Sequence, residues 1–470
     1  MSESKNQDYE YSTIVTVAKK LRASFDDLHI SVTNIEIEKL SCFFNNVYGT
    51  RNRAFHDIFH ALNVSDGCSG LGVLAGFFHD VVYVQIDRGR LPELREHFGI
   101  FTVTEKLELT IPSETTLTAE PWANSLVTIF GFSPNQTLGI FTGLNEFLSA
   151  WVATQMLHKY LTKEQIIHVV ACIEATIPFR GEMINPTVSE RLRENVKKAL
   201  RDNHCTVSEE GLTHTIKESV KISNNDIKGF GMEKPDFFIH NSWALLYESN
   251  PALQNGYFSI VKYREPLQRL DAFFGGLNPQ KIFTHFAGSP NKEEMAKLSE
   301  VATNNLRVGR AYIQAKLLDT AILEAFALIS GGDCPLELFT GPKPRRRESK
   351  TARIEQFLDW ENVTTLNSVK DENVIRLLND GRAFRSKFDV KTALFAAYIY
   401  LALSPEQFAL AYSSACKFFK REITPEEFLT SIPDEHIYHI GDVISHIAWT
   451  RTDAILKYLE NRKPQERKSA

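Results

Sequence analysis

Residues 71–83 read Leu71-Gly-Val-Leu-Ala-Gly-Phe-Phe-His-Asp-Val-Val-Tyr83 and carry the strongest structural signal in the chain. The run from Leu71 to Phe78 has no polar side chain, which predicts a buried helix. His79 and Asp80 stand at its end. Polar groups in such a place are costly unless they are paired or coordinated. The stretch therefore predicts a buried helix that ends in a His-Asp pair with a chemical task.

The rest of the chain shows the helical period as well. Apolar residues recur at i, i+3, i+4 and i+7, and strand-like alternation is rare. Ser404-Pro405 and Thr424-Pro425 each place a capping residue before a proline at the first helical position. We therefore expect an all-α protein, and the predicted helices include residues 14–25, 35–47, 147–161, 166–175, 311–329, 393–403 and 405–419.

Chain length predicts more than one domain, because 470 residues exceed one ordinary hydrophobic core. The clearest linker is Gly341-Pro-Lys-Pro-Arg-Arg-Arg-Glu-Ser-Lys350, where two prolines and a charge run disfavour a helix. We expect a first domain with helical extensions over 1–340 and a C-terminal helical domain of unknown role over 351–470.

Composition is that of a globular protein, with 43% hydrophobic and 24% charged residues. The net charge of -5 argues against general nucleic-acid binding. Six scattered cysteines and a polar N-terminus without an apolar core predict a cytoplasmic protein with reduced thiols. Residues 121–145 carry no charge, but Pro134 interrupts them, so we expect two short buried segments and no membrane span.

A second histidine motif, Phe55-His-Asp-Ile-Phe-His-Ala61, precedes the His-Asp pair. His56 and His60 are four residues apart, which on a helix places both rings on one face. Imidazole and carboxylate together suit magnesium, manganese, zinc or iron. The two motifs therefore predict a site for one or two divalent metal ions.

These motifs resemble the HD superfamily of metal-dependent phosphohydrolases. Phe55–Ala61 resembles the Tyr-His-Asn-x-x-His-Ala helix of the cyclic-nucleotide phosphodiesterase branch, and Phe78–Tyr83 resembles the Phe-His-Asp-x-x-Tyr of bacterial members. The resemblance implies an HD-domain-like helical bundle and a metal held by His60, His79, Asp80 and a distal aspartate. It also implies that His56 protonates a leaving oxygen.

Asp226 is the best candidate for the distal aspartate, because it follows Val220-Lys-Ile-Ser-Asn-Asn225 at the end of a predicted helix. Asp236 is the alternative. The separation of nineteen residues between His60 and His79 is shorter than in the cyclic-nucleotide branch, and that branch's purine-clamp pattern is absent from the sequence. The sequence therefore leaves the substrate within the superfamily open.

Three arginines are candidates for binding an anionic substrate, since guanidinium groups pair with phosphate oxygens. Arg51 and Arg53 precede His56, and Arg180 follows a predicted helix. The expected function is hydrolysis of a nucleotide or small phosphate ester by metal-activated water. A phosphodiesterase is included in this expectation, and so is a homo-oligomer as one alternative for the assembly.

Two other functions stay open. A diiron oxygenase of the same fold needs additional histidine ligands, for which His97, His158 and His168 are the candidates. A catalytically silent protein that binds a nucleotide and signals through the C-terminal helices is the other alternative. Iron content and turnover distinguish these functions.

Overall fold

The computed structural model describes residues 12–87, 94, 96–180, 187–342, 353–360, 363 and 370–462. The predicted all-α architecture is confirmed, because helices make up nearly all of the regular structure in these ranges. The chain forms two compact units. The first contains residues 1–231 and 280–300, and the second contains residues 232–279 and 301–470.

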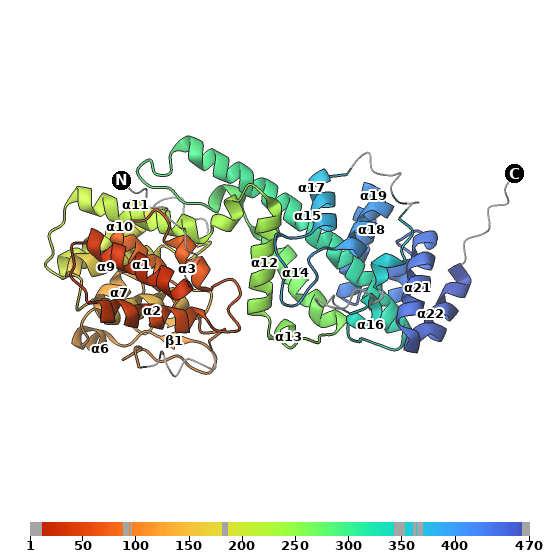
Figure 1. The fold of residues 1–470 in the computed structure, drawn as a ribbon, viewed down its shortest axis with the longest axis horizontal. Coiled ribbons are helices and arrows are strands. Elements are labelled where there is room, and N and C mark those ends of the chain that lie inside the picture. The colour runs from red at the N-terminus through yellow and green to blue at the C-terminus, as the bar shows by residue number, and fades with distance from the viewer. Residues whose placement is uncertain are drawn as a thin grey trace, which may run out of the picture. The chain divides into compact units, whose positions relative to one another are not determined.

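The first unit is a helical bundle with one small sheet (Figure 1). Its two strands are antiparallel and pair Leu109 with Leu138 and Thr110 with Thr137. The elements are α1 Thr13–Asp27, α2 Asn34–Tyr48, α3 Ile58–Val64, α4 Gly70–Phe78, β1 Leu109–Thr110, α6 Glu114–Ala119, α7 Ala123–Phe130, β2 Thr137–Leu138, α8 Leu144–Leu157, α9 Lys163–Glu174, α10 Val188–Asp202, α11 Glu209–Asp226 and η1 Lys228–Gly231.

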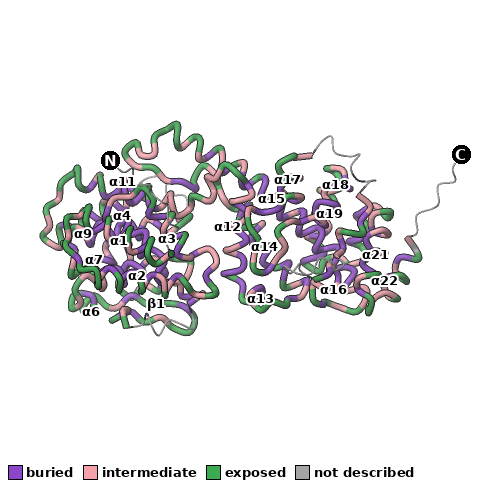
Figure 2. Tube along the Cα trace, viewed as in Figure 1, coloured by how far each residue is buried: buried purple, intermediate pink, exposed green. Residues whose placement is uncertain are grey.

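Helix α4 lies in the interior of this unit, as its composition predicts. All of its residues except Leu71 are buried, and α8 and α9 supply further buried surface (Figure 2). Helix α4 packs against α1, α3, α8, α9 and α11. A helix that has neighbours on every side needs apolar side chains all round, which explains the missing polar face.

Two glycines let α4 approach its neighbours closely. A Cβ atom on Gly76 would lie 2.9 Å from the Cβ of Ser65, just after α3. A Cβ atom on Gly72 would lie 2.1 Å from a carboxylate oxygen of Glu218 on α11. The two glycines therefore let α4 lie close to the end of α3 and to the middle of α11, the helices that carry His60 and Asp226.

The uncharged stretch 121–145 forms short elements, as predicted. It contains α7, the strand β2 and the start of α8, with Pro134 in the turn between them. In the described part of the chain, no helix has the length and apolar content that crossing a membrane requires. The side chains of this stretch instead contribute to the core, with Leu126, Ile129 and Leu144 buried.

The second unit is also helical. Its elements are α12 Pro235–Ser249, α13 Pro251–Gln254, α14 Ile260–Gly276, α16 Glu337–Thr340, η3 Ile354–Gln356, α17 Glu372–Asp380, α18 Leu394–Ala402, α19 Pro405–Phe419, α20 Pro425–Leu429, α21 Asp434–Ile447, η5 Trp449–Arg451, α22 Thr452–Leu459 and η6 Glu460–Arg462. Helix α15, Lys292–Ser330, begins in the first unit and continues into the second, and η2 Pro279–Lys281 spans the earlier boundary. Ser404 and Thr424 form the predicted N-caps, each within a capping box.

The division into units does not coincide with the linker predicted at 341–350. Residues 301–340 group with the C-terminal helices, because the buried face of α15 packs among them. From position 343 onward, the predicted linker lies outside the described residues.

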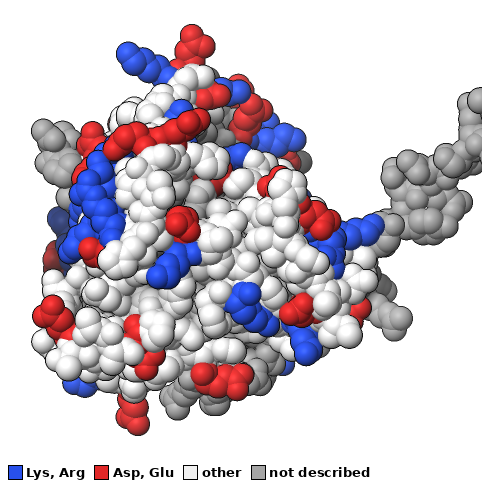
Figure 3. Space-filling model, turned by 90° about the vertical axis from the view of Figure 1, so that its left-hand side faces the viewer, with Lys and Arg blue, Asp and Glu red and all other residues white. Residues whose placement is uncertain are grey.

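On the face drawn in Figure 3, positive and negative side chains are interspersed among broad uncharged areas. That face lacks the field of one sign that binding to a nucleic-acid backbone requires.

Candidate metal centre

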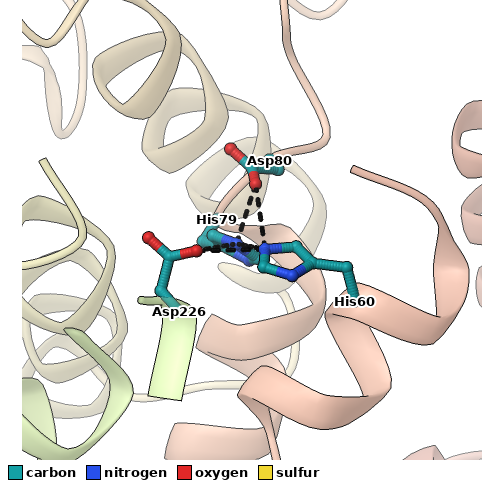
Figure 4. Close-up of side chains that lie close together, drawn as sticks. All are labelled: His60, His79, Asp80 and Asp226. Atoms are coloured by element: carbon teal, nitrogen blue, oxygen red, sulfur yellow. Dashed lines mark hydrogen bonds and ion pairs between the residues drawn. The ribbon is translucent and has the colours of Figure 1, made fainter. Parts of the chain in front are cut away.

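Four side chains converge in the first unit: His60 from α3, His79 and Asp80 at the end of α4, and Asp226 at the end of α11 (Figure 4). One nitrogen or oxygen atom from each lies within 4.8 Å of the corresponding atoms of the others. The two histidines and Asp80 are buried, and the Asp226 side chain is 15% exposed. The structure thus brings together the four residues that the resemblance to the HD superfamily assigns to a metal.

The distances between donor atoms fit a shared cation. His60 Nε2 lies 3.0 Å from Asp226 Oδ1 and 3.3 Å from His79 Nε2. His79 Nε2 lies 2.9 Å from Asp80 Oδ2 and 3.6 Å from Asp226 Oδ1. Donors about 2.1 Å from one ion, at angles of about 90–109°, lie roughly 3.0–3.4 Å apart. Two imidazoles and two carboxylates are also a donor set that divalent transition metals and magnesium accept.

Local sequence sets the position of His60. The side chain of Asp57 accepts a hydrogen bond from the backbone N–H of His60 at 3.0 Å and caps α3, which begins at Ile58. The prediction that His56 and His60 share one helix face was therefore wrong, because His56 precedes the cap. His56 nevertheless stays close to the group, with Nε2 3.8 Å from Asp80 Oδ2.

Neighbouring groups orient the other ligands. Nδ1 of His79 lies 2.8 Å from the Gly76 carbonyl oxygen. Donation to this carbonyl places the proton on Nδ1, so Nε2 is the coordinating atom. Asn225 donates to the Val64 carbonyl at 2.9 Å, which ties the end of α11 to the end of α3. This contact holds Asp226 opposite His60.

Three of the four groups, Asp80, Asp226 and His79, have shifted pKa values. Burial raises the pKa of Asp80, but His79 and His56 outweigh it, so the pKa lies well below its ordinary value. Burial likewise raises the pKa of Asp226, and hydrogen bonds with His60 and His79 bring it below its ordinary value. Burial lowers the pKa of His79, yet Asp80 and Asp226 raise it well above its ordinary value. The two carboxylates are therefore stabilised by nearby positive charge, which either protons on the histidines or a bound metal ion can supply.

His56 is enclosed by aromatic rings next to this group. The ring of Tyr83 lies 4.3 Å from the His56 ring, between centroids, and the ring of Phe55 lies 4.9 Å away. His56 is 8% exposed. The His56 imidazole therefore lies beside the four candidate ligands without being one of them, which is the position that a proton donor needs.

Arg53 connects the two histidine motifs. Its guanidinium pairs with Asp87 at 2.6 Å and donates to the carbonyl oxygens of Asp80, at 2.8 Å, and His56, at 3.3 Å. Arg53 is 3% exposed. These contacts use its N–H donors inside the protein, so the geometry favours a positioning role over substrate binding.

The other two predicted arginines have different surroundings. Arg51 is exposed. Arg180 is only 11% exposed in its side chain, because it pairs with the buried carboxylate of Glu174 and also donates to the Glu174 and Ile177 carbonyl oxygens. Within the described residues these contacts use three of the five N–H groups of Arg180, whereas Arg53 makes five such contacts, so Arg180 keeps donors for an anion.

Glu146 is a functional candidate that the sequence did not indicate. It lies on α8 and is part-buried. Its neighbours Asn145 and Ser149 accept hydrogen bonds from the backbone N–H groups of Val84 and Val82, just after the His-Asp pair. Burial, with smaller effects of Asp80 and Asp226, raises the pKa of Glu146 to about 7 against the opposing effect of Arg180. No local motif marks this residue, since its role depends on α8 packing against that loop.

The alternative ligands lie elsewhere. Asp236 is in the second unit, where it accepts from the Phe237 N–H. His168 is buried with Nδ1 3.0 Å from the Thr215 hydroxyl, and burial, with a smaller effect of His214, lowers its pKa to about 3. His158 contacts the Thr154 carbonyl, and His97 lies beside Glu96. Among the described residues, the metal group contains none of these four.

Comparison with known proteins adds no relative to this geometry. No protein-family model, curated protein or solved structure matches the chain.

Proposed function

We propose that this protein is a metal-dependent hydrolase of phosphoric esters, acting on a nucleotide or another small phosphate ester. The observation that carries the proposal is the convergence of His60, His79, Asp80 and Asp226, from three separate helices, with His56 alongside. The motif resemblance to the HD superfamily supports the same chemistry. A divalent ion bound by the four ligands supplies Lewis acidity toward water and the phosphoryl oxygens.

The residues of the chain have distinct tasks in this proposal. Hydrolysis forms a bond from a water oxygen to phosphorus and breaks the bond to the leaving oxygen, which then takes a proton. His56 supplies that proton as a general acid, because its Nε2 lies 3.8 Å from the Asp80 carboxylate, whose negative charge stabilises the protonated imidazole. The Tyr83 ring holds the His56 imidazole in place.

Two further side chains complete the site in this proposal. Arg180, held by Glu174, binds the negative charge of the phosphoryl group. Glu146, on α8, adds a carboxyl group to this site, because the charges of Asp80, Asp226 and Arg180 influence its pKa. Arg53 holds the segments of His56 and Asp80 together by donating hydrogen bonds to their backbone carbonyl oxygens.

The test is a turnover screen of the purified chain, loaded in turn with Mg²⁺, Mn²⁺, Zn²⁺ or Fe²⁺, against nucleotides and small phosphate esters. His56→Ala is expected to lower kcat about 10²–10⁴-fold with the metal content unchanged. His158→Ala, on an exposed part of the same unit, is the matched control and should retain activity.

Two results contradict the proposal. If His56→Ala loses the metal, His56 is a ligand and not a proton donor. If nucleotides bind tightly but no ester is hydrolysed with any of the four metals, the protein is a binding protein. An oxygen-dependent product with iron supports the oxygenase alternative instead.

A further inference from the structure

The second unit contains a polar pocket that has no part in the proposed hydrolysis. Its enclosed volume is about 70 Å³, and the space amounts to about 770 Å³ when the open mouth is included. The lining comes from five separated segments, all within the second unit: the loop and helix start around Tyr257 and Tyr263, the middle of α15, residues 335–341, residues 353–355 and residues 388–395. A pocket of this size accommodates a small molecule and not a polymer.

The floor of the pocket is one face of α15. Lys316, Asp319, Thr320 and Leu323 line it, and their spacing of i, i+3, i+4 and i+7 places them on the same side of the helix. Lys316 is 5% exposed and Asp319 is 7% exposed. Burying two ionisable groups in a cavity wall is costly unless they have partners.

The partners inside the protein satisfy these groups incompletely. Lys316 Nζ lies 3.3 Å from Asp389 Oδ2, and within the described residues this is its one ion pair. The same oxygen accepts from Trp243 Nε1 at 2.9 Å and from the Tyr263 hydroxyl at 3.0 Å. An ammonium group has three N–H donors, and Asp389 and Tyr263 engage two of them, so Lys316 keeps one donor for the pocket.

The charges of the floor are balanced but separated. Lys316 is positive and Asp389 is negative, while the Asp319 carboxyl, whose pKa is raised to about 7 mainly by burial, becomes negative as the pH rises above neutral. Asp319 accepts from the Thr320 hydroxyl at 2.9 Å and lies one helical turn from Lys316. A purely anionic ligand meets repulsion from Asp319, and a purely cationic ligand meets repulsion from Lys316. A ligand that carries both charges avoids both penalties.

The walls are aromatic. Phe258 and Tyr263 are stacked with centroids 5.7 Å apart, and Phe388 and Phe395 also line the space. Tyr257 stands at the pocket and is 73% exposed. Aromatic surface above a charged floor fits a molecule with charged groups at one end and an apolar body at the other.

We infer that this pocket binds a small zwitterion with an apolar body, of the class of the free amino acids. Its carboxylate contacts the Lys316 ammonium, its ammonium contacts the Asp319 carboxyl, and its side chain lies among Phe258, Tyr263 and Phe388.

The experiment titrates the full chain with each of the twenty free amino acids, in a buffer without amino acids, by calorimetry and by thermal shift. At least one apolar amino acid is expected to bind saturably at one site per chain. An alkylamine and an alkylcarboxylate with the same apolar body should each bind at least about tenfold more weakly. Lys316→Met and Asp319→Asn should weaken binding by a similar factor.

Two control variants keep the test decisive. Tyr257→Ala changes an exposed side chain and should fold normally. It is expected to weaken amino-acid binding, and it therefore tests the pocket even if a change at Lys316 unfolds the unit. His60→Ala alters the other unit and should leave amino-acid binding unchanged, so this inference and the proposed hydrolysis fail separately. Absence of saturable binding to the wild type, or equal binding of the single-charge analogues, overturns the inference, and so does unchanged binding by Tyr257→Ala and a folded Lys316→Met.

Discussion

Nε2 of His60 lies 3.0 Å from Oδ1 of Asp226, although 166 positions separate the two residues in the chain. The contact exists because two helix ends meet. Asp57 caps the start of α3 next to His60, and Asn225 binds the Val64 carbonyl at the end of the same helix. Polar side chains brought together in a buried place need a compensating charge, and the metal ion proposed for this site would provide it.

Arg53 should be essential for the stability of the first unit. Arg53→Met leaves the buried Asp87 carboxylate unpaired and removes donors from the carbonyl oxygens of His56 and Asp80. We expect a loss of about 3–5 kcal/mol in the free energy of unfolding, measured by urea denaturation. Arg51→Met, at an exposed position nearby, is the matched control. Equal stability of the two variants would show that the buried ion pair does not hold the loops.

Glu146 should assist cation binding in a manner that depends on pH. Its pKa of about 7 means that it carries full negative charge at pH 8 and little at pH 6. Glu146→Gln should therefore weaken Mn²⁺ binding about three- to tenfold at pH 8 and less at pH 6. Calorimetry gives the ratio of the Mn²⁺ affinities of wild type and variant. Protonation of the metal-binding side chains affects both proteins in the same way, so it cancels in this ratio. Glu38→Gln, on the exposed face of α2, is the control, and a ratio independent of pH would contradict the assignment.

Arg180 should act on substrate and not on the metal. If the proposed function holds, Arg180→Gln raises KM for a phosphate ester about ten- to hundredfold, because it removes a charged hydrogen-bond donor. Glu174→Gln should have a weaker effect in the same direction, since Glu174 only orients the guanidinium. Arg193→Gln, at an arginine paired with Glu209 on the surface, should leave KM unchanged. Loss of metal from Arg180→Gln would argue for a structural role instead.

Asp319 should make the second unit less stable at high pH. Burial, with a smaller effect of Asp389, raises the pKa of Asp319 to about 7 against the opposing charge of Lys316. The folded state holds a proton that the unfolded state releases, so stability falls as pH rises from about 4 to 7. Asp319→Asn lacks this penalty and should gain about 2–4 kcal/mol relative to wild type between pH 5 and pH 8. Urea unfolding at both pH values measures it, and a difference that does not change with pH is the contrary outcome.

Local sequence determined much of the fold. The predicted helix 405–419 has the bounds of α19, since Ser404 and Pro405 fix its start. His79 and Asp80 were recognisable because the buried helix before them is visible in the sequence as an unbroken apolar run. Motifs whose meaning lies within one helix and its caps could therefore be predicted.

Features that depend on distant contacts could not. The expected shared helix of His56 and His60 ignored the ability of Asp57 to cap the chain between them. Arg53 was predicted to bind an anionic substrate, because nothing local shows that Asp87 pairs with it from 34 positions away. The role of Glu146 depends on α8 lying against the loop after Asp80. Each of these depends on tertiary packing.

Metal stoichiometry and affinity decide whether His60, His79, Asp80 and Asp226 bind a metal ion. The chain is stripped with a chelator, reloaded with Mn²⁺ and analysed by elemental analysis and calorimetry as wild type, His60→Ala, Asp226→Asn and, as control, His158→Gln. The wild type and the control should hold at least one ion per chain, and the two ligand variants should bind at least about a hundredfold more weakly. Wild-type stoichiometry and affinity in both ligand variants, or no metal in the wild type, would contradict the account.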